Sequence, residues 1–126
     1  MRYLGVDYGL KKIGLAISEG SLASLYGVLD TQSLEEALNK IRGVIKKEEI
    51  ERLVIGIPES GENKKGVYSF IRRIKNEVEV IEVEETLSSV KALELMKELG
   101  VSKKERQRED AYAAVLILQN FLDSLN

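Results

Sequence analysis

The alternation of apolar and polar residues divides the first part of the chain into three short strands. Apolar runs cover residues 1–8, 13–18 and 23–30, and segments rich in glycine, lysine and serine separate them. Runs of this length between turn residues are typical of strands, and the tight connection over residues 9–12 predicts that the first two strands pair antiparallel. We therefore expect an antiparallel trio at the start of the fold.

The rest of the chain alternates between helical and strand patterns. Ser33 followed by Glu36 forms a capping box, and apolar residues at helical spacing then predict a helix to about Lys47. The continuous apolar run RLVIGI at 52–57 favours a parallel strand that is buried on both faces, and the polar stretch ESGENKKG at 59–66 predicts a loop. The remaining predicted elements are a helix marked by Val67, Phe70, Ile71 and Ile74, a strand over 78–83, a helix over 88–99 and a last helix from Glu109 to about Leu122.

This order of elements predicts an α/β fold. Three strands are followed by helix, strand, helix, strand and two helices, and strand–helix–strand connections are right-handed crossovers between parallel strands. We expect a five-stranded mixed sheet flanked by helices. The length of 126 residues fits one domain, residues 1–126, with one continuous core.

The composition excludes several kinds of chemistry. The sequence has no cysteine and no histidine, so disulfides, zinc sites built on thiolate or imidazole, a cysteine nucleophile and a Ser-His-Asp triad are ruled out. The net charge of −2 argues against binding of nucleic acid over the whole protein surface, although it is compatible with a local basic patch. Because no long apolar run or signal-peptide pattern occurs, we expect no membrane association and a cytoplasmic location.

Carboxylates fall at the ends of three predicted elements. Asp7 lies at the end of the first strand, Glu84 and Glu85 follow the fifth, and Asp110 is in the first turn of the last helix. Open sheets bind ligands outside the carboxyl ends of their strands. Neighbouring carboxylates resist joint ionisation, and a pair of Mg²⁺ ions would relieve this repulsion. Taken one at a time, each acid is also typical of an ordinary turn or helix start.

Four stretches of the chain, in this order, resemble one known family. They read GVDYGLKKIGLAIS at 5–18, LVIGIPES at 53–60, VEETLSSVKA at 83–92 and EDAYAAVLILQNFL at 109–122. Together they resemble the YqgF family, whose members are also called RuvX, Holliday junction resolvases or pre-16S rRNA nucleases, over almost the whole chain. The resemblance implies a ribonuclease H-like fold.

The resemblance also implies a catalytic, metal-binding triad of Asp7, Glu85 and Asp110 that holds two Mg²⁺ or Mn²⁺ ions. The family pattern around its second acid, Asp-Glu-Arg-Leu-Thr-Thr, falls on residues 84–89, so Glu85 matches the catalytic carboxylate. Thr86 stands where the family has arginine, which removes a forked phosphate donor.

Glycines and basic residues near the triad are candidates for contact with substrate. Gly9 and Gly14 would let the backbone and substrate approach closely, or would serve the turn and the strand packing. Lys64 and Lys65 of the predicted loop are further sources of positive charge, and residues 102–108 read equally well as a basic loop or as a solvated helix face. The predicted nucleic-acid contacts are Lys11, Lys12, Lys103, Lys104, Arg106 and Arg108.

These features favour a metal-dependent nuclease that hydrolyses phosphodiesters and processes the 5′ end of pre-16S rRNA in ribosome biogenesis. Resolution of Holliday junctions in DNA recombination and repair involves the same bond and the same ions, so the sequence leaves it open. A noncatalytic RNA-binding factor in ribosome assembly is a further alternative, and the Asp-x-Gly turn is also compatible with an actin-like nucleotide-binding fold. The expected partner is structured RNA or branched DNA, bound by a monomer or a two-fold homodimer.

Overall fold

Five strands form one mixed sheet in the computed structural model, which describes residues 1–59, 61–84 and 109–125, the side chains of 109 and 110 excepted. The elements are β1 (Tyr3–Tyr8), β2 (Lys12–Ser18), β3 (Ser24–Asp30), α1 (Leu34–Lys47), β4 (Arg52–Ile57), α2 (Glu62–Ile74), β5 (Glu79–Glu84) and α4 (Glu109–Ser124). The strand order is β3-β2-β1-β4-β5. β2 pairs antiparallel with β1 and β3, whereas β4 pairs parallel with β1 and β5. The predicted α/β fold, an antiparallel trio followed by two parallel crossovers, is confirmed.

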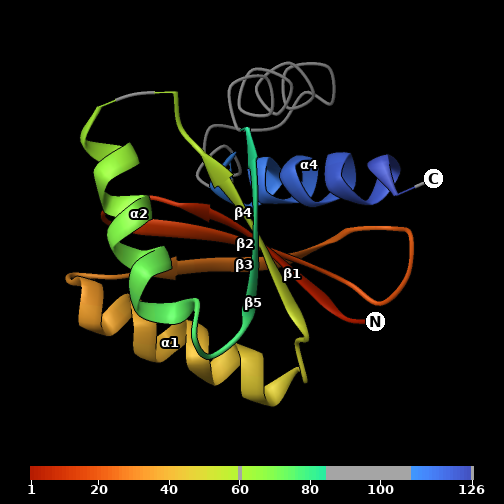
Figure 1. Cartoon of the computed structure of the whole chain (residues 1–126), viewed down its shortest axis with the longest axis horizontal. Coiled ribbons are helices and arrows are strands. Elements are labelled where there is room, and N and C mark those ends of the chain that lie inside the picture. Colours follow the sequence, from red (N-terminus) through yellow and green to blue (C-terminus); the bar gives the residue numbers. More distant parts are fainter. Residues whose placement is uncertain (60, 85–108, 126) are drawn as a thin grey trace.

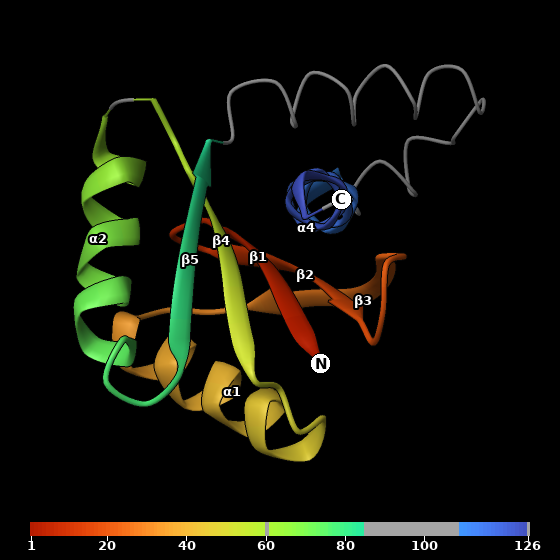
Figure 2. The same cartoon turned by 45° about the vertical axis from the view of Figure 1, so that its right-hand side comes forward.

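The sheet lies between two apolar layers. α1 and α2 cover one face and α4 covers the other (Figures 1 and 2). Because successive side chains of a strand point to opposite faces, Leu4 and Val6 of β1 pack in the layer of α1 and α2, and Tyr3 packs in the layer of α4. In β4, residues 53–56 are all buried, which confirms the strand predicted to be covered on both faces.

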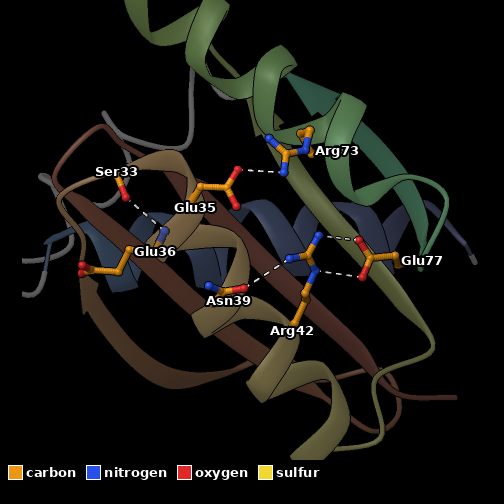
Figure 3. Close-up of polar contacts among 7 residues, drawn as sticks. All are labelled: Ser33, Glu35, Glu36, Asn39, Arg42, Arg73 and Glu77. Carbon is orange, nitrogen blue, oxygen red and sulfur yellow. Dashed lines mark hydrogen bonds and ion pairs between the residues drawn. The ribbon is translucent and has the colours of Figure 1, made fainter.

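Ion pairs connect α1 with α2 and with the turn that follows it (Figure 3). The Arg42 guanidinium donates to both carboxylate oxygens of Glu77, each at 2.8 Å, and these hydrogen bonds lower the pKa of Glu77. Arg73 of α2 lies 2.7 Å from Glu35 in the first turn of α1. Exposed pairs of this kind fix geometry and contribute little to the free energy of unfolding. They hold the two helices side by side on one face of the sheet.

Three details of the elements bear on the sequence predictions. Ser33 caps α1 as predicted, because its hydroxyl accepts the backbone N–H of Glu36 at 3.1 Å. The loop predicted over 59–66 is wrong from residue 62 onward, since α2 begins at Glu62. The charged residues of this segment form helix readily, but they lack the apolar spacing that marks a helix in a sequence. The sequence predicted that Glu84 follows the fifth strand, whereas in the structure it is the last residue of β5.

The helix predicted over 88–99 lies outside the described residues. Among the helices that the structure describes, none is both long enough and apolar enough to cross a membrane.

Candidate active site at the carboxyl edge of the sheet

The carboxyl ends of β1, β4 and β5 meet at one edge of the sheet because the three strands run parallel. Val6 pairs with Ile55, and Ile57, two residues further along β4, pairs with Glu84 of β5. Asp7 follows Val6 at this edge and is only 8% exposed. It is the one charged residue that is buried among the described side chains. Charged residues are seldom buried without a specific reason, so Asp7 is the leading candidate for a functional group here.

A close contact fixes α4 on the sheet beside β1. The ring of Tyr3 packs edge-on against Phe121, with ring centroids 5.5 Å apart. Two residues further along the same face of β1, a Cβ atom built on Gly5 would lie 2.7 Å from Cβ of Leu118 and 3.0 Å from the carbonyl oxygen of Ala114. α4 therefore rests directly on the strand backbone, at a distance that only glycine permits.

These two contacts also set the direction of α4 over β1. From Tyr3 to Gly5 along β1, the contact point on α4 moves from Phe121 to Leu118, which is closer to the start of the helix. Asp7 lies on the same face of β1, two residues beyond Gly5, which is about 7 Å further along the strand. On α4 the same distance corresponds to four or five residues, at about 1.5 Å each. That distance reaches the first turn of α4, where Asp110 stands in the sequence. The register thus brings the backbone of Asp110 to the end of β1 that carries Asp7.

Several predicted site residues lie outside the described residues. Glu85 directly follows Glu84 in the sequence but is not described, and of Asp110 only the backbone is described. In the part of the chain that the structure describes, no three acidic side chains gather closely enough to hold a metal ion. The triad of Asp7, Glu85 and Asp110 therefore stays a prediction. The predicted contacts Lys103, Lys104, Arg106 and Arg108 also lie outside this part.

The other predicted residues lie in the turn between β1 and β2 and at the start of β2. A Cβ on Gly9 would lie 2.6 Å from the carbonyl oxygen of Lys12, so Gly9 is required by the turn itself. The carbonyl of Lys11 accepts the backbone N–H of Thr31 at 2.9 Å, which ties the turn to the end of β3. The side chains of Lys11 and Lys12 are exposed, and Gly14 is buried opposite Asp7. Contact of these residues with substrate stays a prediction.

A hollow between α2 and the ends of β4 and β5 was not predicted from the sequence. It measures about 620 Å³, and its lining includes Lys64 and Tyr68 of α2 and Glu82 and Glu84 of β5. A hydrogen bond to Glu82 raises the pKa of Tyr68. Lys64 and Tyr68 are four residues apart and share one helix face, but the sequence prediction placed Lys64 in a loop and so missed this arrangement.

The chain matches the family model described as "RuvX: Holliday junction resolvase" over residues 1–124. Two relatives named "Putative pre-16S rRNA nuclease" have similar sequences. The relative from Bacteroides thetaiotaomicron is 38% identical, and the match covers 98% of this chain and 96% of the relative. The relative from Sulfurihydrogenibium sp. is 36% identical, with 99% of this chain and 92% of the relative covered.

Two solved structures have a similar fold at low sequence identity. T. thermophilus RuvC in complex with Holliday junction substrate has a TM-score of 0.68 and 16% identity, with 99% of this chain and 95% of that chain covered. The fowlpox virus Holliday junction resolvase has a TM-score of 0.67 and 14% identity, and both chains are covered completely. At this identity the likeness concerns the fold alone, and it confirms the predicted ribonuclease H-like class.

The contact at Gly5 predicts a specific effect of a small substitution. Gly5→Ala forces α4 away from β1, because the added Cβ meets Leu118 and the backbone of Ala114. Overpacking of this kind costs about 1–3 kcal/mol of the free energy of unfolding, measurable by urea denaturation. Gly27→Ala in β3 is the matched control, since nothing lies within 4 Å of its Cβ position. Equal stability of the two variants would contradict the close contact.

Proposed function

Since this chain belongs to the RuvX family, we propose that it is a nuclease that hydrolyses phosphodiester bonds, with precursor 16S ribosomal RNA as its substrate. The match to the family model and the names of the two relatives support this proposal. The observation that carries it is the buried carboxylate of Asp7 at the edge where the first turn of α4 meets the end of β1. A four-way DNA junction is the second candidate substrate, supported by the description of the family model and by the two resolvases of similar fold.

We propose Asp7, Glu85 and Asp110 as the ligands of two Mg²⁺ or Mn²⁺ ions. The donor chemistry fits, because carboxylate oxygens are the ligands that these hard cations prefer. Asp7 lies at the end of β1, Glu85 is the residue after the last residue of β5, and Asp110 belongs to the first turn of α4. Such cations, when bound, lower the pKa of water and stabilise negative charge on phosphate and leaving oxygens.

The chain itself contributes position and charge. Strand β1 is buried along its whole length, so Asp7 is held rigidly, and α4 adds the positive end of its helix dipole at the same place. The exposed ammonium groups of Lys11 and Lys12 are suited to hold the phosphates next to the scissile one. In the reaction, the oxygen of water forms a bond to phosphorus while the bond to the 3′ oxygen breaks, which leaves a 5′-phosphate and a 3′-hydroxyl.

Gathering the acids at one edge has an electrostatic consequence. Carboxylates that share a site raise one another's pKa, and a divalent cation offsets this repulsion. Lys11 in the neighbouring turn and Lys12 at the start of β2 would lessen the repulsion only partly, since both are exposed to solvent. The proposed site therefore depends on cations for its charge balance, which is testable without any measurement of cleavage.

Mn²⁺ is expected to raise the melting temperature of the wild-type protein but not that of Asp7→Asn. A ligand at about a hundred times its dissociation constant stabilises the folded state by about 2.7 kcal/mol, which corresponds to several degrees. The control is Asp30→Asn, because Asp30 is an exposed acid at the end of β3, two strands from β1, and this variant should respond like the wild type. If Mn²⁺ raises the melting temperature of Asp7→Asn as much as that of the wild type, Asp7 is not a ligand of the ion.

With Mn²⁺ present, the wild-type protein is expected to cleave precursor 16S rRNA and to leave a four-way DNA junction intact. Asp7→Asn should lose at least about a hundredfold in cleavage rate, since a metal ligand supplies several kcal/mol of transition-state stabilisation, and Asp30→Asn should keep full activity. The rates are measured on end-labelled substrates by gel electrophoresis.

Cleavage of the junction alone would favour the second substrate. RNA binding without cleavage of either substrate would instead show a noncatalytic RNA-binding protein.

A further inference from the structure

The outer face of α2 carries an unusual concentration of positive charge. A hollow of about 710 Å³ runs along it, and its lining includes Lys64, Lys65 and Arg72 together with one carboxylate, Glu59. We call the residues Gly61, Lys64, Lys65, Tyr68, Ser69 and Arg72 the basic face of α2. Three cations against one carboxylate give this surface a charge of +2, whereas the whole chain has −2.

The cations of this face differ from other cations of the chain in their partners. The ion pairs in the described part of the structure engage Lys40, Arg42, Arg52 and Arg73. Arg72 instead donates to the hydroxyl of Ser69 at 3.2 Å, and Lys64 donates to the backbone carbonyl of Glu59 at 3.4 Å. These acceptors are uncharged, so Glu59 alone among the lining residues offsets part of the positive charge of the face.

The neighbouring residues Arg72 and Arg73 make the contrast clear. Arg73 points toward α1, where Glu35 pairs with it at 2.7 Å (Figure 3). Arg72 lines the hollow on the outer side of α2. Two adjacent arginines therefore have different surroundings, one with a carboxylate partner and one on the basic face.

The basic face is continuous with the candidate active site. The 710 Å³ hollow and the 620 Å³ hollow at the ends of β4 and β5 share Glu59, Lys64 and Tyr68. The second hollow reaches Glu84, the residue before the proposed ligand Glu85. A chain that enters at the carboxyl edge of the sheet can thus pass over Tyr68 onto the outer side of α2.

The spacing of the charges suits a phosphate backbone. Lys65 and Arg72 are seven residues, or about 10 Å, apart along the helix. Each strand of a duplex carries one phosphate per about 3.4 Å of the duplex axis, so more than one phosphate of a strand lies within this length. Tyr68 lies between the cations along the helix and hydrogen-bonds with Glu82 of β5. An aromatic ring among cations is typical of surfaces that bind nucleic-acid strands.

We propose that the basic face of α2 binds the phosphate backbone of the substrate next to the cleaved bond. This inference rests on the proposed function and adds a second contact region to it. The contact recognises the charged phosphate backbone and not the bases. It therefore contributes affinity for RNA and DNA alike and carries no base specificity.

The test compares two pairs of charge-neutralising variants of the full chain. Lys64→Gln/Lys65→Gln is compared with Lys46→Gln/Lys47→Gln, which removes two lysines from the last turn of α1 at the opposite edge of the sheet. Arg72→Gln is compared with Arg73→Gln. Binding to a fluorescein-labelled RNA hairpin and to a labelled four-way DNA junction is measured by anisotropy in EDTA, over about 50–200 mM KCl.

Loss of two phosphate contacts should lower the slope of log K against log salt by about 1.4–1.8, and loss of one by about 0.7–0.9. We expect these losses for Lys64→Gln/Lys65→Gln and for Arg72→Gln, respectively, on both probes. The variants at Lys46 and Lys47 and at Arg73 should bind like the wild type.

Two results separate the inference from the function on which it rests. If the wild type cleaves substrate but the variants of the basic face bind as tightly as their controls, the inference is overturned and the nuclease function stands. If the wild type binds the probes through the basic face but cleaves neither substrate with Mn²⁺, the proposed function fails and the binding surface stands.

Discussion

The close contact between α4 and β1 is the constraint on which the candidate site depends. The helix approaches the strand so closely that Gly5 has no room for a Cβ beneath Leu118. Small residues on the helix side allow the same approach, and Ala111 and Ala114 are fully buried there. This packing fixes how far along the strand each turn of the helix lies. Because of it, the first turn of α4 lies over the end of β1, although more than a hundred residues separate the two segments in the sequence.

The charges around the candidate site allow a polyanion, such as nucleic acid, to bind next to the proposed cluster of carboxylates. The proposed ligands concentrate negative charge at the carboxyl edge, and the chain as a whole is also negative. Lys11 and Lys12 at the connection from β1 to β2, and the basic face of α2 next to the ends of β4 and β5, place cations on two sides of this edge. Under physiological screening, charges act over roughly 8 Å, so a polyanion near the site meets these cations more than the distant acids. The net charge of the chain therefore does not oppose binding at this edge.

The sequence predicted the elements well where apolar residues recur at regular spacing, and less well in charged segments that lack this spacing. The alternation in residues 3–30 gave the three antiparallel strands, and RLVIGI gave the buried parallel strand. The start of α2 was missed because its first turn has no apolar residue. The role of Gly5 was missed too, because close approach of two distant segments leaves no local pattern. Asp7 was predicted at a strand end and is buried there, whereas its convergence with Glu85 and Asp110 stays a prediction.

The most direct measurement of this convergence is paramagnetic broadening of backbone amide signals by Mn²⁺ in an NMR spectrum of the full chain. The ion broadens signals only in its neighbourhood, so it reports which segments surround one site. We expect loss of the amide signals around Asp7, Glu84 and Asp110 at low Mn²⁺ concentration, while those around Lys46 and Lys47, in the last turn of α1, persist. Broadening that spares the first turn of α4, or that spreads evenly over the exposed acids, would contradict a shared ion site at this edge.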